Sequence, residues 1–471
     1  MTLNSAGPEF EAELRAHLSE NVFRPDPARY LEDPHGRYQG QSGLVLAPVT
    51  VDQVATIVRA AARARIGVVP FGGGTGLVGG QTALSGPAPV IVSLERMNVI
   101  RAIYPSENLL IAEAGVILAD VQSAAKEAGR LFPLSLAAEG SARIGGNLAT
   151  NAGGLNVLRY GNARDLCLGL EAVLPDGSVW NGLSRLRKDN TGYDLRNLLI
   201  GSEGTLGIIT AATLKMSPRP VAEGTAFLVV PSPQAAVDLL SLTRNEIGDQ
   251  TTAFEIMHRQ GLEFLEETLP DVRQPFDAKP EWCVLIEVGL SSRLDPVEVL
   301  ERLFESATGA GLVLDGLVAQ SQRQSNEFWA VREHLPEANR RIGAIAIHDI
   351  SIPISLIPDF IKQSDQRIAE IGDFRINCFG HLGDGNLHYN VYPVSGRSRA
   401  DHQDHRDLIK RAIYDLVQEM HGSISAEHGI GRLKVDELEH YGDWVKLGAM
   451  RSIKAALDPL GILNPGAVLR N

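Results

Sequence analysis

The sequence predicts an α+β protein whose two halves differ in texture. Of twelve histidines, only His17 and His35 precede His258, and the histidine-poor half is rich in glycine. After Pro218-Arg219-Pro220, helical stretches alternate with β-rich ones. Two of these β-rich stretches are neighbours across a turn, which predicts that at least part of the sheet is antiparallel. We therefore expect the first half to bind a cofactor and the second half to carry the chemistry.

The domain boundaries are placed where these patterns change. The first domain is expected over residues 1–218 and the second over residues 219–420. The remaining segment, 421–471, is expected to pack back on the first domain and close the active site.

Composition limits the class of protein. With 471 residues the chain can bury two or three cores, and a net charge of −13 argues against a nucleic-acid-binding protein. The cysteines, Cys167, Cys283 and Cys378, form no CxxC pair, which argues against a disulfide framework or a thiolate zinc site. No signal pattern is visible, and no apolar run approaches the roughly 18 residues of a membrane helix. We expect a cytoplasmic enzyme with no membrane span.

Local patterns predict the elements of the first domain in chain order. Thr50-Val51-Asp52-Gln53 is typical of a capping box that opens a helix, and Pro175-Asp176-Gly177 marks the turn of a hairpin. The expected elements are a helix with Phe10, Leu14, Leu18 and Val22 on one face, a second with Val54, Ile57, Val58 and Ala61 inward, strands at 67–71, 90–94 and 109–113, a helix at 118–128, hairpin strands at 170–174 and 178–180, and a strand region at 205–216.

The second domain is expected to be an α+β domain, in which helices alternate with strands along the chain. The expected helices are 235–242, 297–307 and 355–371, and the expected β stretches are 282–288, 312–318, 345–352, 374–379 and 387–392.

The stretch PFGGGTGLVGGQ, Pro70 to Gln81, contains the dinucleotide fingerprint GxGxxG at Gly74–Gly79. In a Rossmann unit a helix begins at the third glycine. Here two glycines and two prolines fall among residues 80–89, and such a segment cannot form that helix. The fingerprint is therefore not a Rossmann one, although Glu95 lies near the position of a ribose-binding acid. Backbone N–H groups of a glycine run can still bind phosphate, and the alternative is a surface turn.

Similar glycine segments recur later in the first half. They occupy Gly140–Asn147, Asn151–Gly154 and Gly201–Gly207. Three such segments in one domain favour a long ligand held in extended form by backbone contacts.

The combined motifs resemble a known family over most of the chain, from about Tyr38 to Gly466. PFGGGTGLVGGQ, IGGNLATNAGG, RYGNARDLCLGLEAVLPDGSVW and LLIGSEGTLGIIT resemble the two-part FAD-binding domain of the vanillyl-alcohol oxidase type. HLGDGNLHYN, SAEHGIG and LDPLGILNPG resemble its branch of D-2-hydroxyacid dehydrogenases, which oxidise D-lactate, D-2-hydroxyglutarate or glycolate. The resemblance implies FAD along the first domain and a substrate (cap) domain with a largely antiparallel sheet.

The resemblance also implies which residues surround FAD. No histidine occurs between His35 and His258, and Cys167 lies outside the glycine segments, so the FAD is expected to be non-covalent. The implied residues are Gly72, Gly73, Gly74, Thr75, Gly76, Gly79, Gln81, Pro133, Ser135, Gly140, Ser141, Gly145, Gly146, Asn151, Gly153, Gly154, Gly161, Glu203, Gly204, Gly207, Ile208, Ile209 and Asn464.

His381 and His388 flank a turn between two β-prone runs, so a hairpin can bring them close enough to share a metal ion. Two histidines at this spacing alone favour a structural role. The adjacent residues Glu427 and His428, together with a flavin domain, favour a metal site instead. The resemblance maps His381, His388 and Glu427 onto metal ligands and His428 onto the catalytic base. Zn²⁺ is expected, and Mn²⁺ also suits this ligand set.

Oxidation of a 2-hydroxy acid removes a hydroxyl proton and a hydride from Cα. A divalent ion would lower the pKa of the hydroxyl, His428 would take the proton, and flavin N5 would take the hydride. Arg332 is expected to hold the C1 carboxylate, with Asn390 and His428 as further substrate contacts. The alternative for Arg332 is a surface helix arginine paired with Glu333 or another neighbour.

The substrate and the electron acceptor stay open at this point. Relatives specific for hydroxyglutarate carry Lys where this chain has Ile347 and Thr where it has Pro336, so a monocarboxylate is equally credible. The acceptor could be a quinone, a cytochrome or an electron-transfer flavoprotein. The sequence does not determine the oligomeric state, and a homodimer is one of the possibilities. Two other classes remain: a flavin-binding electron-transfer subunit of a glycolate oxidase-like complex, and a nicotinamide or metal hydrolase enzyme.

Overall fold

The computed structural model describes residues 2–34, 36–291 and 294–470, so His35 lies outside the described residues. The chain divides into two compact units. The first comprises Met1–Gly154, Gly161–Pro218 and Glu427–Asn471, and the second comprises Leu155–Tyr160 and Arg219–Ala426.

Two short segments lie in the second unit, contrary to expectation. Residues 421–426 belong there because Ser423 forms an antiparallel bridge with Ser351, and only residues 427–471 join the first unit. Residues 155–160 also belong there, where α6 (Val157–Tyr160) packs against a strand of that unit. Both placements depend on pairings between distant parts of the chain.

The first unit contains three sheets. The parallel sheet has the order β1-β3-β2, the antiparallel sheet has the order β4-β5-β9-β7-β8, and β6 pairs with β10. The strands are β1 (Leu44–Leu46), β2 (Val68–Phe71), β3 (Val90–Ser93), β4 (Ile100–Tyr104), β5 (Leu109–Glu113), β6 (Arg130–Leu131), β7 (Cys167–Val173), β8 (Val179–Gly182), β9 (Ile208–Lys215) and β10 (Ser217–Pro218). The predicted strands and the hairpin of β7 and β8 are confirmed.

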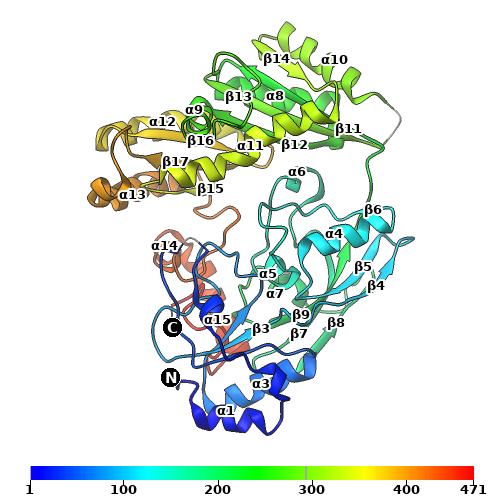
Figure 1. The fold of residues 1–471 in the computed structure, drawn as a ribbon, viewed down its shortest axis with the longest axis vertical. Helices are drawn as coiled ribbons and strands as arrows, with labels where there is room; N and C mark the ends of the chain where they lie inside the picture. Colours follow the sequence, from blue (N-terminus) through cyan, green and yellow to red (C-terminus); the bar gives the residue numbers. More distant parts are fainter. Residues whose placement is uncertain (1, 35, 292–293, 471) are drawn as a thin grey trace. The chain divides into compact units, whose positions relative to one another are not determined.

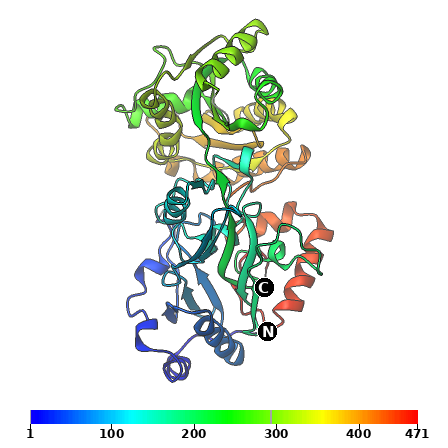
Figure 2. The same ribbon diagram turned by 90° about the vertical axis from the view of Figure 1, so that its right-hand side faces the viewer.

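Short helices complete the first unit. Figure 2 shows the C-terminal helices α14 and α15, drawn in red, beside the strands of this unit. The helices are α1 (Pro8–Arg15), α2 (Ala28–Leu31), α3 (Val51–Ala64), α4 (Leu118–Glu127), α5 (Ile144–Ala149), α7 (Leu195–Leu199), α14 (Val435–Tyr441) and α15 (Trp444–Leu457). The expected N-terminal helix ends early, at Arg15, although Leu18 and Val22 are still buried.

Helix α3 shows how the local sequence sets an element. Thr50 is the N-cap, and its hydroxyl accepts a hydrogen bond from the backbone N–H of Gln53 at 3.3 Å. The reciprocal bond goes one residue further out than a capping box predicts, from the N–H of Val49 to Oε1 of Gln53 at 2.8 Å. The apolar stripe of α3 is buried, as its periodicity predicts.

The second unit is built on one seven-stranded sheet with the order β14-β11-β13-β12-β16-β17-β15. Its described pairings are all antiparallel, which confirms the expected sheet type. The strands are β11 (Ala222–Val230), β12 (Thr251–His258), β13 (Trp282–Leu290), β14 (Asp315–Val318), β15 (Asp349–Ser351), β16 (Arg375–His381) and β17 (Asn386–Tyr392). In addition to α6, this unit contains the helices α8 (Pro233–Glu246), α9 (Arg259–Thr268), α10 (Pro296–Gly309), α11 (Gln322–Ile342), α12 (Ile357–Ile371) and α13 (Gln403–Glu419).

Helix α11 was not expected, and it lies across this sheet (Figure 1). One of its faces makes a side-chain hydrogen bond to each of four successive strands. The pairs are Ser325 with Thr225 of β11 at 2.7 Å, Trp329 with Glu287 of β13 at 2.8 Å, Arg332 with Glu255 of β12 at 2.7 Å, and Asn339 with Asn377 of β16 at 2.8 Å. These bonds fix the position of α11 along the strands, and with it the position of Arg332.

Thr50→Ala tests the N-cap of α3. Loss of the hydroxyl acceptor should lower the free energy of unfolding by about 1 kcal/mol. Thr56→Ala is the matched control, because Thr56 lies in the same helix and its hydroxyl bonds only the carbonyl of Asp52. Thermal unfolding followed by circular dichroism compares the two variants. A lower midpoint in the control alone would contradict this assignment.

Candidate functional site

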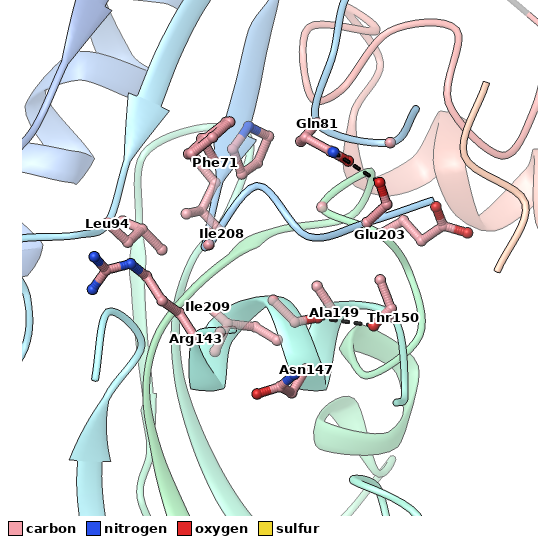
Figure 3. Close-up of a pocket in the computed structure, with 18 of the residues that line it drawn as sticks. Phe71, Gln81, Leu94, Arg143, Asn147, Ala149, Thr150, Glu203, Ile208 and Ile209 are labelled. Atoms are coloured by element: carbon pink, nitrogen blue, oxygen red, sulfur yellow. Dashed lines mark hydrogen bonds between the residues drawn. The ribbon is translucent and has the colours of Figure 1, made fainter. Parts of the chain in front are cut away.

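The first unit contains a cavity beside the glycine loop. Its wall consists of this loop, of α5 and of the segment from Glu203 to β9 (Figure 3). The lining residues are Pro70, Phe71, Gly72, Gly73, Gly74, Thr75, Gly76, Gly80, Gln81, Leu94, Arg143, Gly145, Gly146, Asn147, Ala149, Thr150, Glu203, Gly204, Gly207, Ile208, Ile209 and Asn464.

Fourteen of the cofactor residues implied by the sequence line this cavity, and the others lie outside its lining. Gly140 and Ser141 line an adjoining hollow that also contacts Gly72, Gly73 and Gly74. Asn151 accepts a hydrogen bond from the N–H of Arg164 at 3.0 Å, which is a structural contact. The other residues outside the lining are Gly79, Pro133, Ser135, Gly153, Gly154 and Gly161.

Two glycines in the cavity wall have opposite surroundings. A Cβ atom on Gly73 would lie 2.2 Å from the carbonyl oxygen of Ser141, so only glycine lets the loop approach so closely. A Cβ atom on Gly146 would instead meet nothing within 4 Å. The structure therefore leaves open space next to the cavity wall at Gly146, as expected where a ligand must lie against the backbone.

The end of the glycine loop is held by side chains from the C-terminal segment. Nδ2 of Asn464 donates to the carbonyls of Gly80 at 3.0 Å and Glu203 at 2.7 Å. Nη1 of Arg432 donates to the carbonyls of Gly79 at 3.0 Å and Gly80 at 2.7 Å, and Nη2 donates to Oδ1 of Asn464 at 2.7 Å. Burial lowers the pKa of Arg432 to about 10, which still leaves it charged. Asn464 and Arg432 thus form a clamp on the loop, and sequence reasoning missed Arg432.

Glu203 connects the cavity to the loop that carries Glu427 and His428. Its carboxylate accepts hydrogen bonds from the N–H groups of Ile430 at 2.7 Å and Gly431 at 2.8 Å. Oε1 of Glu427 accepts a hydrogen bond from the N–H of Gly154 at 2.8 Å. The first unit therefore holds the segment with Glu427 and His428 through a residue of the cavity wall.

The second unit brings His381 and His388 together on one face of its sheet. They lie on the neighbouring strands β16 and β17, with ring centroids 5.9 Å apart. Each faces a carboxylate on its other neighbouring strand, Glu255 opposite His381 and Asp349 opposite His388. Asp349 Oδ1 is 3.9 Å from Nδ1 of His388. This set of two imidazoles, each backed by a buried carboxylate, fits a divalent metal ion.

Glu255 was missed by sequence reasoning, although it is buried on this face. Its Oε2 accepts a hydrogen bond from Nε of Arg332 at 2.7 Å, and its Oε1 lies 2.6 Å from Nδ1 of His381. Burial alone would raise the pKa of Glu255, but His381 and Arg332 lower it to about 2. The one available signal was an acid inside the apolar run TTAFEIM, since acids are rarely buried without a partner.

Arg332 is buried, and the surface-arginine alternative is wrong. It pairs with Glu255, and its guanidinium lies 5.0 Å above the ring centroid of Phe379. Asn390 lies on the same sheet face as His388, where its Oδ1 accepts a hydrogen bond from the N–H of His348 at 3.0 Å. Ile347, by contrast, is 63% exposed.

Comparison with known proteins identifies the class. Residues 43–182 match the FAD binding domain family, and residues 219–468 match the family of FAD linked oxidases, C-terminal domain. The chain therefore belongs to the FAD-linked oxidases and is an FAD-dependent oxidoreductase.

Three relatives are named for the same activity. The chain is 38% identical to the mitochondrial D-2-hydroxyglutarate dehydrogenase of Arabidopsis thaliana, over 92% of this chain and 76% of the relative. It is 38% identical to the mitochondrial enzyme of that name from Rattus norvegicus, over 91% and 78%. The D-2-hydroxyglutarate dehydrogenase of Xanthomonas citri pv. viticola is 35% identical, over 94% and 92%.

Solved structures with low sequence identity share the fold. p-Cresol methylhydroxylase superposes with a TM-score of 0.76 at 15% identity, over 99% of this chain and 98% of that one. 4-Ethylphenol oxidase from Gulosibacter chungangensis gives 0.73 at 19% identity, over 99% and 98%. These likenesses confirm the vanillyl-alcohol oxidase type of fold. In the described parts of the chain, no helix has both the length and the apolar character needed to cross a membrane.

Gly146→Ala tests the cavity as the FAD site. The added methyl group meets no protein atom within 4 Å, so it should oppose the ligand and not the fold. An extra methyl group in a filled site costs about 1–3 kcal/mol, so the FAD dissociation constant should rise by about 5- to 150-fold. Fluorescence titration of the apoprotein with FAD measures it.

Gly448→Ala in α15 is the control, because Gly448 is an exposed helical glycine with equally open surroundings. This variant should keep the parental FAD affinity. Parental affinity in Gly146→Ala as well would show that FAD does not contact α5 at this point.

Proposed function

We propose that the protein oxidises a D-2-hydroxy acid to the 2-oxo acid and passes the electrons to a separate acceptor. The observation that carries this proposal is the second unit's sheet face, where Arg332 lies beside the pair His381 and His388. Arginine can bind the C1 carboxylate of a 2-hydroxy acid, and a metal ion held by the two histidines can bind the hydroxyl on C2. The two groups of the protein therefore suit the two adjacent groups of the substrate. The named activity of the relatives supports the same class.

FAD supplies the acceptor for the hydride that leaves Cα. Its binding is proposed to be non-covalent, because the residues that line the cavity include neither histidine nor cysteine. The glycine loop would hold the pyrophosphate through backbone N–H groups, and the clamp of Arg432 and Asn464 keeps that loop in place.

His381, His388 and Glu427 would hold a divalent ion, Zn²⁺ or Mn²⁺, which would lower the pKa of the substrate hydroxyl. The path of the chain supports Glu427 as the third ligand. The N–H of Ala426 bonds the carbonyl of Asp349 at 3.3 Å, and Asp349 lies opposite His388. Glu427 is the next residue along the chain.

Side chains of the protein bind the substrate and accept its proton. Arg332 binds the C1 carboxylate, and Asn390 contributes a further polar contact from β17. His428 takes the proton from the C2 hydroxyl on an imidazole nitrogen, because one nitrogen of a neutral imidazole carries a basic lone pair. Loss of that proton and of the Cα hydride converts the hydroxy acid to the 2-oxo acid.

Two substrate classes are supported by different observations. The relatives favour a dicarboxylate, D-2-hydroxyglutarate. Ile347 and Pro336, which replace the Lys and Thr of hydroxyglutarate-specific enzymes, favour a monocarboxylate such as D-lactate. An apolar side chain at residue 347 offers no charge to a second carboxylate.

An anaerobic screen of D-2-hydroxy acids measures this directly. Bleaching of the oxidised flavin absorbance by a hydroxy acid alone should occur, with the D isomer far faster than the L isomer. The ratio of rates for D-2-hydroxyglutarate and D-lactate selects the substrate class. A flavin that no hydroxy acid bleaches would contradict the proposed reaction and favour an electron-transfer subunit.

His428→Asn tests the proton acceptor. The variant keeps much of the side-chain shape but loses the basic nitrogen, so flavin reduction should slow by about 10²- to 10⁴-fold with FAD still bound. The acidic limb of the pH–rate profile should disappear, because no imidazole remains to be deprotonated. His440→Asn, at an exposed histidine of α14, is the control and should reduce flavin at the parental rate. If His428→Asn does so too, another group is the base.

A further inference from the structure

One buried carboxylate on the second unit's sheet face has a different partner on each oxygen. Oε2 of Glu255 receives the Nε–H of Arg332, and Oε1 contacts Nδ1 of His381. All three side chains are buried, and Glu255 is 1% exposed. Both partners have distinct tasks in the proposed reaction, one toward the substrate carboxylate and one toward the metal ion.

The contact with His381 selects a ring tautomer. A carboxylate offers acceptors only, so Nδ1 of His381 must carry the proton in this hydrogen bond. Nε2 then carries the lone pair that a metal ion requires. This is the common arrangement in which a carboxylate fixes the tautomer and the orientation of a metal-binding histidine.

The contact with Arg332 uses only its inner nitrogen. Within the described parts of the chain, Nη1 and Nη2 make no hydrogen bond, while Nε is taken by Glu255. The planar guanidinium is therefore held at its base, and its outer nitrogens keep the geometry for a bidentate carboxylate. The guanidinium carbon also lies over the ring of Phe379, 5.0 Å from its centroid.

We propose that Glu255 is a positioning residue that sets both ends of the substrate site at once, Arg332 for the C1 carboxylate and His381 for the metal ion. This inference rests on the proposed function. The C1 carboxylate and the C2 hydroxyl sit on adjacent carbon atoms, so their two binding groups must keep a fixed separation. A single carboxylate bonded to both groups provides that separation, whereas two independent partners would let them move separately.

A second carboxyl group on the same face, half-buried, provides a comparison. Glu287 lies on the neighbouring strand β13, opposite Ala253, and accepts hydrogen bonds from Trp329 at 2.8 Å and Thr252 at 2.7 Å. Neither partner belongs to the proposed site. Glu287→Gln makes the same substitution on the neighbouring strand. Its amide oxygen can still accept the hydrogen bond from Trp329 that helps to place α11, so this variant should leave the contacts of Glu255 with Arg332 and His381 unchanged.

The first measurement needs neither metal nor turnover. In the metal-free holoenzyme, the Nδ1–H of His381 should give a low-field proton resonance, assigned by its loss in His381→Asn. This resonance should disappear or shift in Glu255→Gln and persist in Glu287→Gln. An unchanged resonance in Glu255→Gln overturns the claim that Glu255 fixes the ring.

The second measurement compares binding constants of the flavin-loaded variants. Zn²⁺ affinity, from competition with a chromogenic chelator, should fall about 10- to 100-fold in Glu255→Gln, and the KM for the hydroxy acid should rise about 10-fold or more. Parental values for both constants overturn the proposal. Flavin content and thermal midpoints show whether each variant is folded.

Glu255→Ala removes both acceptors and tests whether one residue serves both ends. A change in only one of the two constants in this variant overturns the shared role. If the parental protein binds no Zn²⁺ or Mn²⁺, the metal part of the proposed function fails on its own. The proton resonance and the KM then still decide whether Glu255 positions His381 and Arg332.

Discussion

Buried charge must be matched by buried partners, and this constraint determines how each unit places its functional groups. In the second unit, Glu255 satisfies it with Arg332 and His381. In the first unit, Arg432 satisfies it with backbone carbonyls and Asn464. A buried ion left without its partner costs several kcal/mol, so each cluster can exist only as a complete set. The geometry of both sites follows from this all-or-none requirement.

The two units use backbone and side chains in opposite ways. The cavity wall of the first unit is rich in glycine, and Gly72 and Gly146 let the loop and α5 approach each other closely. Its buried polar side chains serve to hold that main chain. In the second unit the main chain forms a regular sheet, and the side chains on one face form the site. Binding of a long cofactor and recognition of a small acid therefore make different demands on sequence.

Much of the fold could be predicted because local signals determine it. The cap at Thr50, the turn at 175–177 and the hairpin that carries His381 and His388 all depend on residues close in sequence. The glycine loop was correctly separated from a Rossmann unit for the same reason. Periodicity and turn chemistry were sufficient in these segments.

The parts of the fold and of the site that could not be predicted depend on contacts between residues distant in sequence, which local patterns do not encode. Helix α11 was not predicted because the polar residues Arg332 and Asn339 interrupt the apolar stripe of its buried face. Their partners lie on different strands of the sheet. The apolar run around Glu255 indicates burial but not its partners, and nothing in the sequence marks Arg432. Only the tertiary structure supplies the partners of both residues. The placements of residues 155–160 and 421–426 also follow from pairing with distant strands.

The interleaved order of the segments has a consequence for biosynthesis. Strand β2 is an edge of its sheet, and Val68 pairs with Leu463, near the end of the chain. The ribosome synthesises the whole second unit between these two residues. Until then the nascent first unit has an unpaired edge and a glycine loop without Arg432 and Asn464, a state in which chaperones protect exposed strands. The cavity wall is therefore complete only when Asn464 has joined the glycine loop.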